Sequence, residues 1–251
     1  FNTLASDNVN LYVSSLHYSS TNGYTQVGSV YRSSNNGDNW LVSNSGLRGV
    51  GIKSFISEGG YLIAGTSESG IYRSADNGLN WISVNTGLTN LRISALTSGN
   101  GYLFAGTLGG GVFRSDNYGN TWEAVNTGLI YSYIYSLAIS GSRLLAGSGG
   151  GGVFRSDDNG TSWTLSNSGI TNPGHVYAFA VKEGYVFAAN GGTVYRSTNN
   201  GTSWPASSSM GGFSRVVTMG TIAGNVFVST SASCCEPNSF KRSTDNGESW
   251  I

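Results

Sequence analysis

The stretch Gly111-Val112-Phe113-Arg114-Ser115-Asp116-Asn117-Tyr118-Gly119-Asn120-Thr121-Trp122 is the clearest copy of a motif that occurs six times in the chain. Each copy has an Arg-Ser pair after an aromatic residue (a lysine in the last copy), a glycine four residues after the serine, and a tryptophan three residues after the glycine. The motif uses all 6 tryptophans of the chain, at positions 40, 81, 122, 163, 204 and 250. The period of about 41 residues is typical of propellers, solenoids and other repeat arrays.

The third unit shows how one repeat is built. Ile93–Ser98 alternates apolar with small or polar residues, which predicts a strand. The turn at Asn100-Gly101 leads into a second strand, Tyr102–Thr107, and further strands are predicted at Val112–Ser115 and Trp122–Val125. Four short strands in about 40 residues form one antiparallel up-and-down sheet, and a ring of such sheets is a propeller.

The sequence therefore predicts an all-β protein, a β-propeller of four-stranded antiparallel blades forming a single domain, 1–251. Six blades are predicted, and seven blades, with one outside this sequence, are the alternative. The chain begins at Phe1 without a signal peptide and ends at Ile251, just inside the fourth strand of the last unit, so we expect a fragment or module of a longer chain. The predicted units are about 1–47, 48–88, 89–129, 130–170, 171–211 and 212–251.

Two units depart from the template between their second and third strands. Unit one inserts Leu16–Gly28 and unit six inserts Ser231–Phe240. We expect both insertions to be long loops, which lie side by side if six units close into a ring. The adjacent Cys234 and Cys235 in the second insertion form either a strained vicinal disulfide or two free thiols.

The composition excludes several partners. Only 10% of residues are charged and the formal net charge is +0, so the basic surface that nucleic-acid binding requires is missing. No run of 18 apolar residues predicts insertion into a membrane. Low charge with abundant Ser, Thr and Asn suits a secreted, extracellular or cell-surface protein. No cofactor is predicted, and no metal site, because the two histidines and two cysteines show no ligand spacing.

The residues of the motif have physical roles in a tight turn. Glycine adopts positive φ at little cost, and Ser with Asp or Asn can bond the amides of the turn itself. A buried tryptophan ring can tie each sheet to the next. The six arginines allow two interpretations: a ring of cations for an anionic ligand, or bonds within the turn and to neighbouring blades, which we favour.

The pattern Ser-x-Asp-x-Gly-x-Thr-Trp resembles the Asp-box, or bacterial neuraminidase repeat, most closely at Ser243–Trp250 and Ser74–Trp81. Units one and five have Asn35 and Asn199 in place of its aspartate. Propellers of this kind include sialidases, xyloglucanases, sortilin-type receptors and photosystem II assembly factors, so the resemblance implies a fold and not one function. It also implies that the motif is structural and lies opposite the working face. The structural residues so implied are Ser33, Gly37, Trp40, Ser74, Asp76, Gly78, Trp81, Ser115, Gly119, Trp122, Ser156, Asp158, Gly160, Trp163, Ser197, Gly201, Trp204, Ser243, Asp245, Gly247 and Trp250.

A ligand site is expected on the other face, where the loops between second and third strands and the links between blades lie. Just before each first strand, equivalent positions carry polar or aromatic side chains, which can bond sugars, carboxylates or a peptide end. An ordinary exposed polar rim is the alternative. Together with residues of the two insertions, the candidate binding residues are Arg92, Tyr133, His175, Arg215, His17, Tyr18, Tyr24 and Glu236.

Glycosidase chemistry needs two carboxylates flanking one bond. Only Glu68 and Glu236 fall on the candidate face, in different units, and no sialidase arginine triad can be assembled. We therefore predict a non-catalytic binding or scaffold propeller within a larger secreted or surface protein, with a protein or a glycan as partner. The near-identical units are similar to those of secreted bacterial repeat proteins. The alternatives are a carbohydrate-active enzyme resembling sialidases or xyloglucanases, and a structural subunit of a filament or surface layer.

Overall fold

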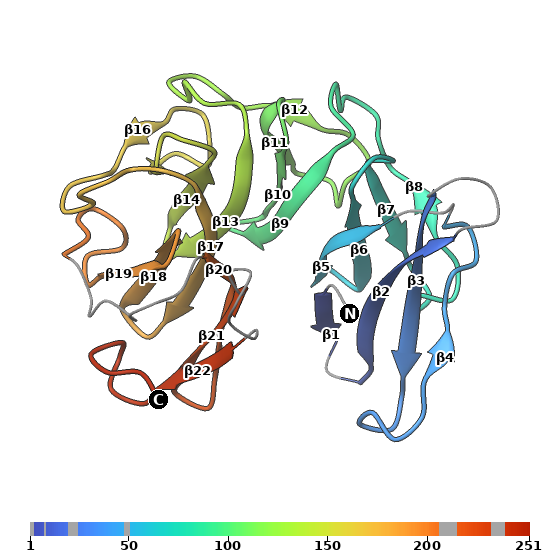
Figure 1. Cartoon of the computed structure of the whole chain (residues 1–251). Coiled ribbons are helices and arrows are strands. Elements are labelled where there is room, and N and C mark those ends of the chain that lie inside the picture. The colour runs from blue at the N-terminus through green and yellow to red at the C-terminus, as the bar shows by residue number, and fades with distance from the viewer. Residues whose placement is uncertain (1–2, 8, 20–24, 48–50, 206–214, 232–238) are drawn as a thin grey trace. The chain divides into compact units, whose positions relative to one another are not determined.

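A computed structural model describes residues 3–7, 9–19, 25–47, 51–205, 215–231 and 239–251, with the backbone alone for 16–19, 25–27, 215 and 231. All strands in these residues belong to six antiparallel sheets, each running in chain order (Figure 1). The chain divides into two compact units, Phe1–Ala124 (unit 1) and Val125–Ile251 (unit 2). Each unit is described by itself below, and the single domain stays a prediction.

Unit 1 contains three four-stranded blades. Blade 1 consists of β1 (Thr3–Ser6), β2 (Leu11–Ser19), β3 (Thr25–Ser33) and β4 (Leu41–Val42). Blade 2 consists of β5 (Ile52–Glu58), β6 (Tyr61–Thr66), β7 (Ile71–Ser74) and β8 (Ile82–Ser83). Blade 3 consists of β9 (Ile93–Gly99), β10 (Tyr102–Thr107), β11 (Gly111–Ser115) and β12 (Glu123–Ala124), which confirms the four strands predicted for this repeat.

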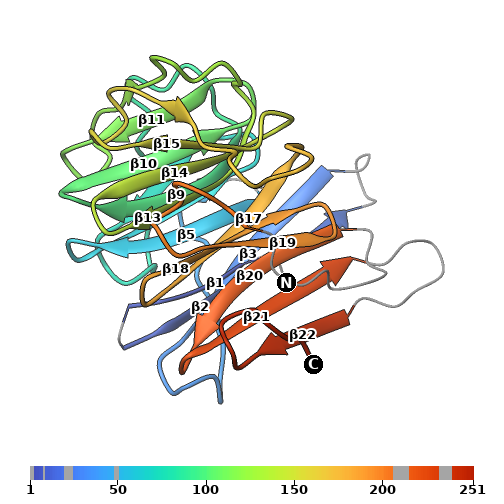
Figure 2. The ribbon, with the colours of Figure 1, turned by 90° about the vertical axis from the view of Figure 1, so that its left-hand side faces the viewer.

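Unit 2 contains blades 4 to 6. Blade 4 consists of β13 (Ile134–Ser140), β14 (Arg143–Ser148), β15 (Val153–Ser156) and β16 (Thr164–Leu165). Three strands are described in blade 5, β17 (Val176–Lys182), β18 (Tyr185–Asn190) and β19 (Thr193–Ser197). Three are also described in blade 6, β20 (Arg215–Ile222), β21 (Asn225–Ser231) and β22 (Ser239–Ser243), and Figure 2 shows β21 between the other two. Ile251 exchanges both backbone hydrogen bonds with Arg242, at 2.8 and 2.9 Å, as the first residue of a fourth strand would.

Within each unit, neighbouring blades pack face to face, so their middle strands are buried on both sides. In β6 and β10 every residue after the first tyrosine is buried, a continuous pattern rather than the alternation of a half-exposed strand. Between blades 2 and 3 the core includes Ile63, Phe113 and Trp122. A corresponding core between blades 4 and 5 includes Leu145, Tyr195 and Trp204.

The insertion in the first repeat, Leu16–Gly28, is not the long loop that we expected. β2 and β3 continue through it, with backbone pairs from Leu16↔Gly28 to Ser19↔Thr25. The insertion thus lengthens a hairpin, because continued pairing satisfies backbone groups that an irregular loop would leave to water. His17 and Tyr18 therefore lie on a strand. In unit six, 232–238 lie outside the described residues.

The motif forms one geometry throughout, which we call the repeat turn (Ser to Trp of each copy). In the second copy the Ser74 hydroxyl accepts from the Gly78 amide at 2.8 Å and donates to the Asp76 carboxylate at 2.7 Å. Asn77 has a φ of +57° and Gly78 one of +80°, the left-handed conformation that Asn and Gly tolerate best. In the third copy Asn117 takes the aspartate's place, and Asn35 and Asn199 do so in the first and fifth.

Tryptophan and arginine join consecutive repeats within a unit. The indole Nε1–H of four tryptophans donates to a main-chain carbonyl oxygen of the preceding repeat, at 2.7 to 3.0 Å, whereas that of Trp40 donates to Gly37 in its own turn. These pairs are Trp81–Ser43, Trp122–Val84, Trp163–Val125 and Trp204–Ser166. The arginines Arg32, Arg73 and Arg196 donate to the carbonyl of the residue before the glycine in the next repeat turn, and Arg155 donates to Thr202. This confirms the architectural interpretation for these four arginines.

A second spacing recurs in the first four repeats and was not predicted from the sequence. Four residues after the tryptophan, an asparagine accepts from the first amide of the third strand, as Asn85 does from Ile71 at 2.7 Å. Two residues later comes a glycine with positive φ, for example Gly87 at +90°. A Cβ on Gly87 would overlap the carbonyl oxygen of Trp122. This Asn-x-Gly element lets the link pass close to the next tryptophan.

Candidate functional site

Each blade has two ends, which we name the turn face (turns between strands one and two and between three and four) and the loop face (loops between strands two and three, and blade links). On the loop face, the carbonyls of Gly51, Arg92 and Tyr133 accept from backbone amides of the loop in the same blade, at 2.7 to 2.9 Å. The positions before the first strands are therefore structurally equivalent, as the spacing predicted.

The structure places part of the predicted binding set. Arg92 is exposed in unit 1, and Tyr133 and His175 are exposed in unit 2. Arg215 in β20 is placed by its backbone alone. Tyr24, Glu236, Cys234 and Cys235 lie outside the described residues.

Tyr133 and His175 lie with three other aromatic residues at the loop-face ends of blades 4 and 5. We call the five residues Tyr131, Tyr133, Tyr135, His175 and Tyr177 the aromatic patch. Its ring centroids lie 5.7 Å apart for Tyr135 and His175, 5.2 Å for Tyr135 and Tyr177, and 5.7 Å for the stacked pair His175 and Tyr177. Tyr131 and Tyr133 are 39% and 49% exposed, His175 is also exposed, and Tyr135 and Tyr177 are half-buried. The patch thus presents aromatic surface to solvent across two blades.

A glycine loop lies behind the patch. Gly149–Gly152 connects β14 to β15, and the Ser148 hydroxyl holds it by accepting from Gly151 at 3.1 Å and donating to Gly152 at 2.9 Å. Gly149 pairs with His175 across the blade boundary. A Cβ on Gly149 would approach Tyr135 at 2.9 Å, and one on Gly151 would overlap Tyr131. The absence of side chains on this loop therefore leaves room for the tyrosine rings.

Carboxylates are separated from the patch. Among the described residues of unit 2, the acidic ones all lie on the turn face, in repeat turns or in the turn between β17 and β18: Asp157, Asp158, Glu183, Asp245 and Glu248. The exposed Glu68, on the loop face, belongs to unit 1. The patch itself contains no Asp, Glu, Lys or Arg.

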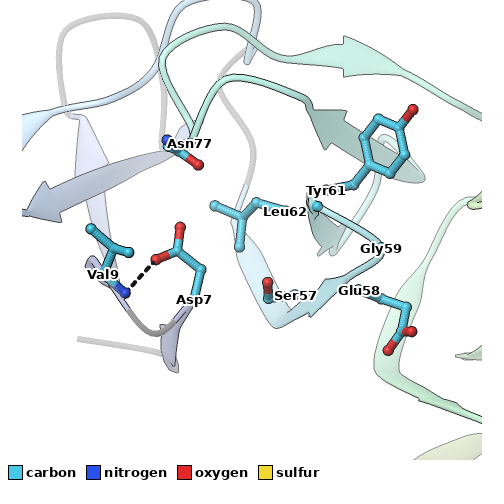
Figure 3. Close-up of a pocket in the computed structure, with 9 residues that line it drawn as sticks. Asp7, Val9, Ser57, Glu58, Gly59, Tyr61, Leu62 and Asn77 are labelled. Atoms are coloured by element: carbon cyan, nitrogen blue, oxygen red, sulfur yellow. Dashed lines mark hydrogen bonds between the residues drawn. The ribbon is translucent and has the colours of Figure 1, made fainter.

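A cavity of about 390 Å³ lies on the turn face of unit 1, lined by Asp7 and Glu58 among others (Figure 3). The Asp7 carboxylate accepts from the amides of Val9 and Asn10, at 3.1 and 2.7 Å, and from the Tyr12 hydroxyl. Burial acts to raise the pKa of Asp7, but these hydrogen bonds outweigh it and lower the pKa. Glu58 points away from Asp7 in Figure 3 and accepts from Ser98 at 2.9 Å. The two carboxylates thus stabilise turns and do not face each other as a catalytic pair.

Three aspartates of repeat turns have lowered pKa values. Hydrogen bonds from the Asn80 side chain and amide, and from Ser74, lower the pKa of Asp76 to about 2. Burial acts to raise the pKa of Asp158, but donors on two serines and on the backbone lower it overall. Serine hydroxyl and amide donors likewise lower the pKa of Asp245.

We expect acid to destabilise the protein through these turns. A carboxylate with a lowered folded pKa stabilises the fold above its unfolded pKa, about 3.9, and loses that contribution as pH falls through the folded pKa, about 2 for Asp76. Asp76→Asn should fold, because Asn35 and Asn117 make the same turn bonds. The variant should show a shallower fall of the urea midpoint between about pH 4 and pH 2 than the wild type. An unchanged slope would mean that Asp76 contributes nothing to acid sensitivity.

Within the described ranges, no three His, Cys, Asp or Glu residues are grouped as metal ligands. In the same part of the chain, no helix has the length and apolar character of a membrane span.

The sequence matches no known protein family and no curated protein. Solved structures are similar, however. The GH74 enzyme of Niastella koreensis aligns with a TM-score of 0.71 and 16% identity, over 96% of this chain and 44% of that chain. YCF48 from Cyanidioschyzon merolae aligns with a TM-score of 0.65 and 16% identity, over 94% of this chain and 83% of that chain. A YCF48 structure bound to a D1 peptide gives 0.65 and 17%, over 88% and 74%.

These similarities establish the class of the fold. The chain is an all-β protein with the β-propeller fold, as its repeat predicted. It spans less than half the length of the GH74 enzyme. An enzyme and a peptide-bound protein share the fold, so the fold alone does not select a function.

Three members of the aromatic patch were not predicted from the sequence. Tyr131, Tyr135 and Tyr177 flank the predicted Tyr133 and His175 at spacings of two residues. Alternate residues of a strand share one side, so Tyr133 and Tyr135, and His175 and Tyr177, could have been paired from the sequence. The sequence did contain a sign of the patch, because Tyr135 and Tyr177 depart from the other repeats. The second and third repeats have Lys53 and Ser94 at the equivalent positions.

Proposed function

We propose that this chain is a non-catalytic binding domain whose partner docks on the loop face at the aromatic patch. The single observation that carries the proposal is a group of five aromatic side chains on one face of two adjacent blades: Tyr131, Tyr133 and His175 are exposed, and Tyr135 and Tyr177 are half-buried. Tyrosine supplies a large apolar area and a hydroxyl at little loss of conformational entropy, and it is enriched in binding surfaces. Among the described residues of unit 2, carboxylates, which are depleted at the centres of interfaces, lie on the other face.

Similar proteins support a binding role. A propeller of similar fold, YCF48, has been solved with a peptide bound. The repeat turn resembles the Asp-box family, in which that motif is structural, and the turn geometry agrees with such a role. We place the domain in a larger secreted or cell-surface protein, because low charge and abundant Ser, Thr and Asn suit that environment.

Binding to a glycan array and a peptide array, combined with hydrolysis assays on xyloglucan and sialoside substrates, tests the proposal. We expect the double variant Tyr133→Ala, His175→Ala to lose at least about tenfold in affinity for whichever array ligand the wild type binds. No hydrolysis should be detected. The matched control is Tyr118→Asn on the turn face, since asparagine occupies this left-handed position in the other repeat turns and Tyr118 is similarly exposed, at 46%.

Three results would contradict the proposal. Hydrolysis of a bound glycan would make the chain an enzyme. Binding that survives the double variant but is lost in Tyr118→Asn would move the site to the turn face. Absence of any ligand, together with self-association through the blade rims, would instead favour a structural subunit.

A further inference from the structure

We infer that the aromatic patch binds an uncharged, proline-rich peptide segment in the polyproline II conformation. The inference rests on the proposed function and adds the chemical class of the partner. Three properties of the patch support it: exposed ring faces, the kind of hydrogen-bonding groups it offers, and its lack of charge.

The first property is the apolar surface of the rings. Tyr133 is 49% exposed, Tyr131 is 39% exposed and packs on Phe154 with centroids 6.2 Å apart, and the rings of His175 and Tyr177 are nearly parallel, with an interplanar angle of 20°. Ring contacts hold Tyr131 against Phe154, and hold His175 and Tyr177 against Tyr135. Pyrrolidine rings pack well on aromatic surfaces held in this way, which is how proline-rich segments are recognised in aromatic-lined grooves.

The second property is hydrogen-bonding complementarity. A polyproline II segment has no internal hydrogen bonds, so its carbonyl oxygens are free, and proline has no amide hydrogen to donate. Such a ligand presents acceptors almost exclusively. Tyrosine hydroxyls and a histidine ring N–H can donate to them. A glycan is different, because each of its hydroxyls is also a donor that is best paired with a strong acceptor such as a carboxylate. In unit 2 the described carboxylates lie on the opposite face.

The third property is charge. The five side chains of the patch are four tyrosines and one histidine, and the glycine loop behind them contributes only backbone. A charged peptide would lose hydration here without gaining an opposite charge from the patch. The backbone of a proline-rich segment is already extended before it binds, so little conformational entropy is lost on a rigid flat surface. We therefore expect binding that depends weakly on salt.

Isothermal titration calorimetry on the full chain tests the inference with three probes: decaproline, a Gly/Ser decapeptide and cellohexaose. We expect decaproline to bind, with less than a twofold change in Kd between about 50 and 300 mM salt. Tyr133→Ala should raise the Kd at least about tenfold, and Tyr133→Phe, which keeps the ring, about fivefold. The control Tyr102→Phe, on the turn face beneath the Arg114 guanidinium, should leave the Kd unchanged.

Each other outcome overturns the inference. Cellohexaose that binds while decaproline does not, with loss of binding in Tyr133→Ala, assigns the patch to glycans and leaves the proposed function standing. Equal binding of decaproline and the Gly/Ser peptide removes the role of proline. Decaproline that fails to bind, or that binds Tyr133→Ala as well as the wild type, removes the site, and the array experiment then decides the proposed function separately.

Discussion

Replacing Trp204 with alanine should lower the free energy of unfolding by about 3–5 kcal/mol, as measured by urea denaturation. Trp204 has no exposed surface, and its ring lies 6.3 Å from that of Phe179 between two blades. Its indole also donates to the carbonyl of Ser166 at 2.8 Å. The substitution leaves both a large cavity and a buried carbonyl without this donor, so two costs add.

Two further variants separate these costs. Trp204→Phe keeps much of the apolar volume but removes the donor, and we expect a smaller loss of about 1–3 kcal/mol. Leu165→Ala changes an apolar side chain that is 52% exposed on β16, and should cost no more than about 0.5 kcal/mol. If Trp204→Ala and Leu165→Ala were equally stable, the tryptophan would not be the element that joins the repeats.

Gly87→Ala should destabilise unit 1 by several kcal/mol, about 4, although only one methyl group is added. Gly87 has a φ of +90°, and a Cβ there would overlap the carbonyl oxygen of Trp122. The neighbouring Thr86 carbonyl accepts from the Trp122 amide at 2.8 Å, so backbone cannot move away without breaking the link between blades. Thermal and urea unfolding of the purified variant measure the effect.

Gly101→Ala is the matched control in the same unit. Gly101 has a similar φ of +83°, but nothing lies within 4 Å of a Cβ built on it. This variant reports the cost of the left-handed conformation alone, about 1 kcal/mol. Equal losses in the two variants would show that conformation, and not contact with Trp122, explains why glycine is needed at position 87.

Much of the fold was predictable because the same motif and strand pattern recur in each repeat. One unit read at a period of two gave strands that match β9 to β11 closely, and the Asn100-Gly101 turn took the positive φ values expected of it. The insertion in the first repeat was wrongly predicted to be a loop. Two polar, weakly alternating strands pair in a register that depends on the partner strand, and one sequence does not show that register clearly. The Asn-x-Gly element was missed because its reason is an approach between repeats.

The candidate site was less predictable. Tyr133 and His175 were predicted because they occupy equivalent positions just before the first strands. The up-and-down strand order placed them on the loop face. The topology did not show that His175 contacts the rings of Tyr135 and Tyr177, because these two tyrosines have the spacing of ordinary strand residues. Which side chains gather depends on how adjacent blades pack. That information comes from tertiary structure, and a single repeat does not contain it.

The bonds between repeats have a consequence for how this chain could change over generations. Trp122 and Arg73 each reach across to a main-chain oxygen, on Val84 and on Tyr118, and a main-chain oxygen is present whatever amino acid occupies the position. A copy of the motif therefore needs no particular side chain in its neighbour at these contacts. Duplicating, deleting or exchanging a whole copy preserves these junctions, and the loop face can diversify while the joints between copies stay the same.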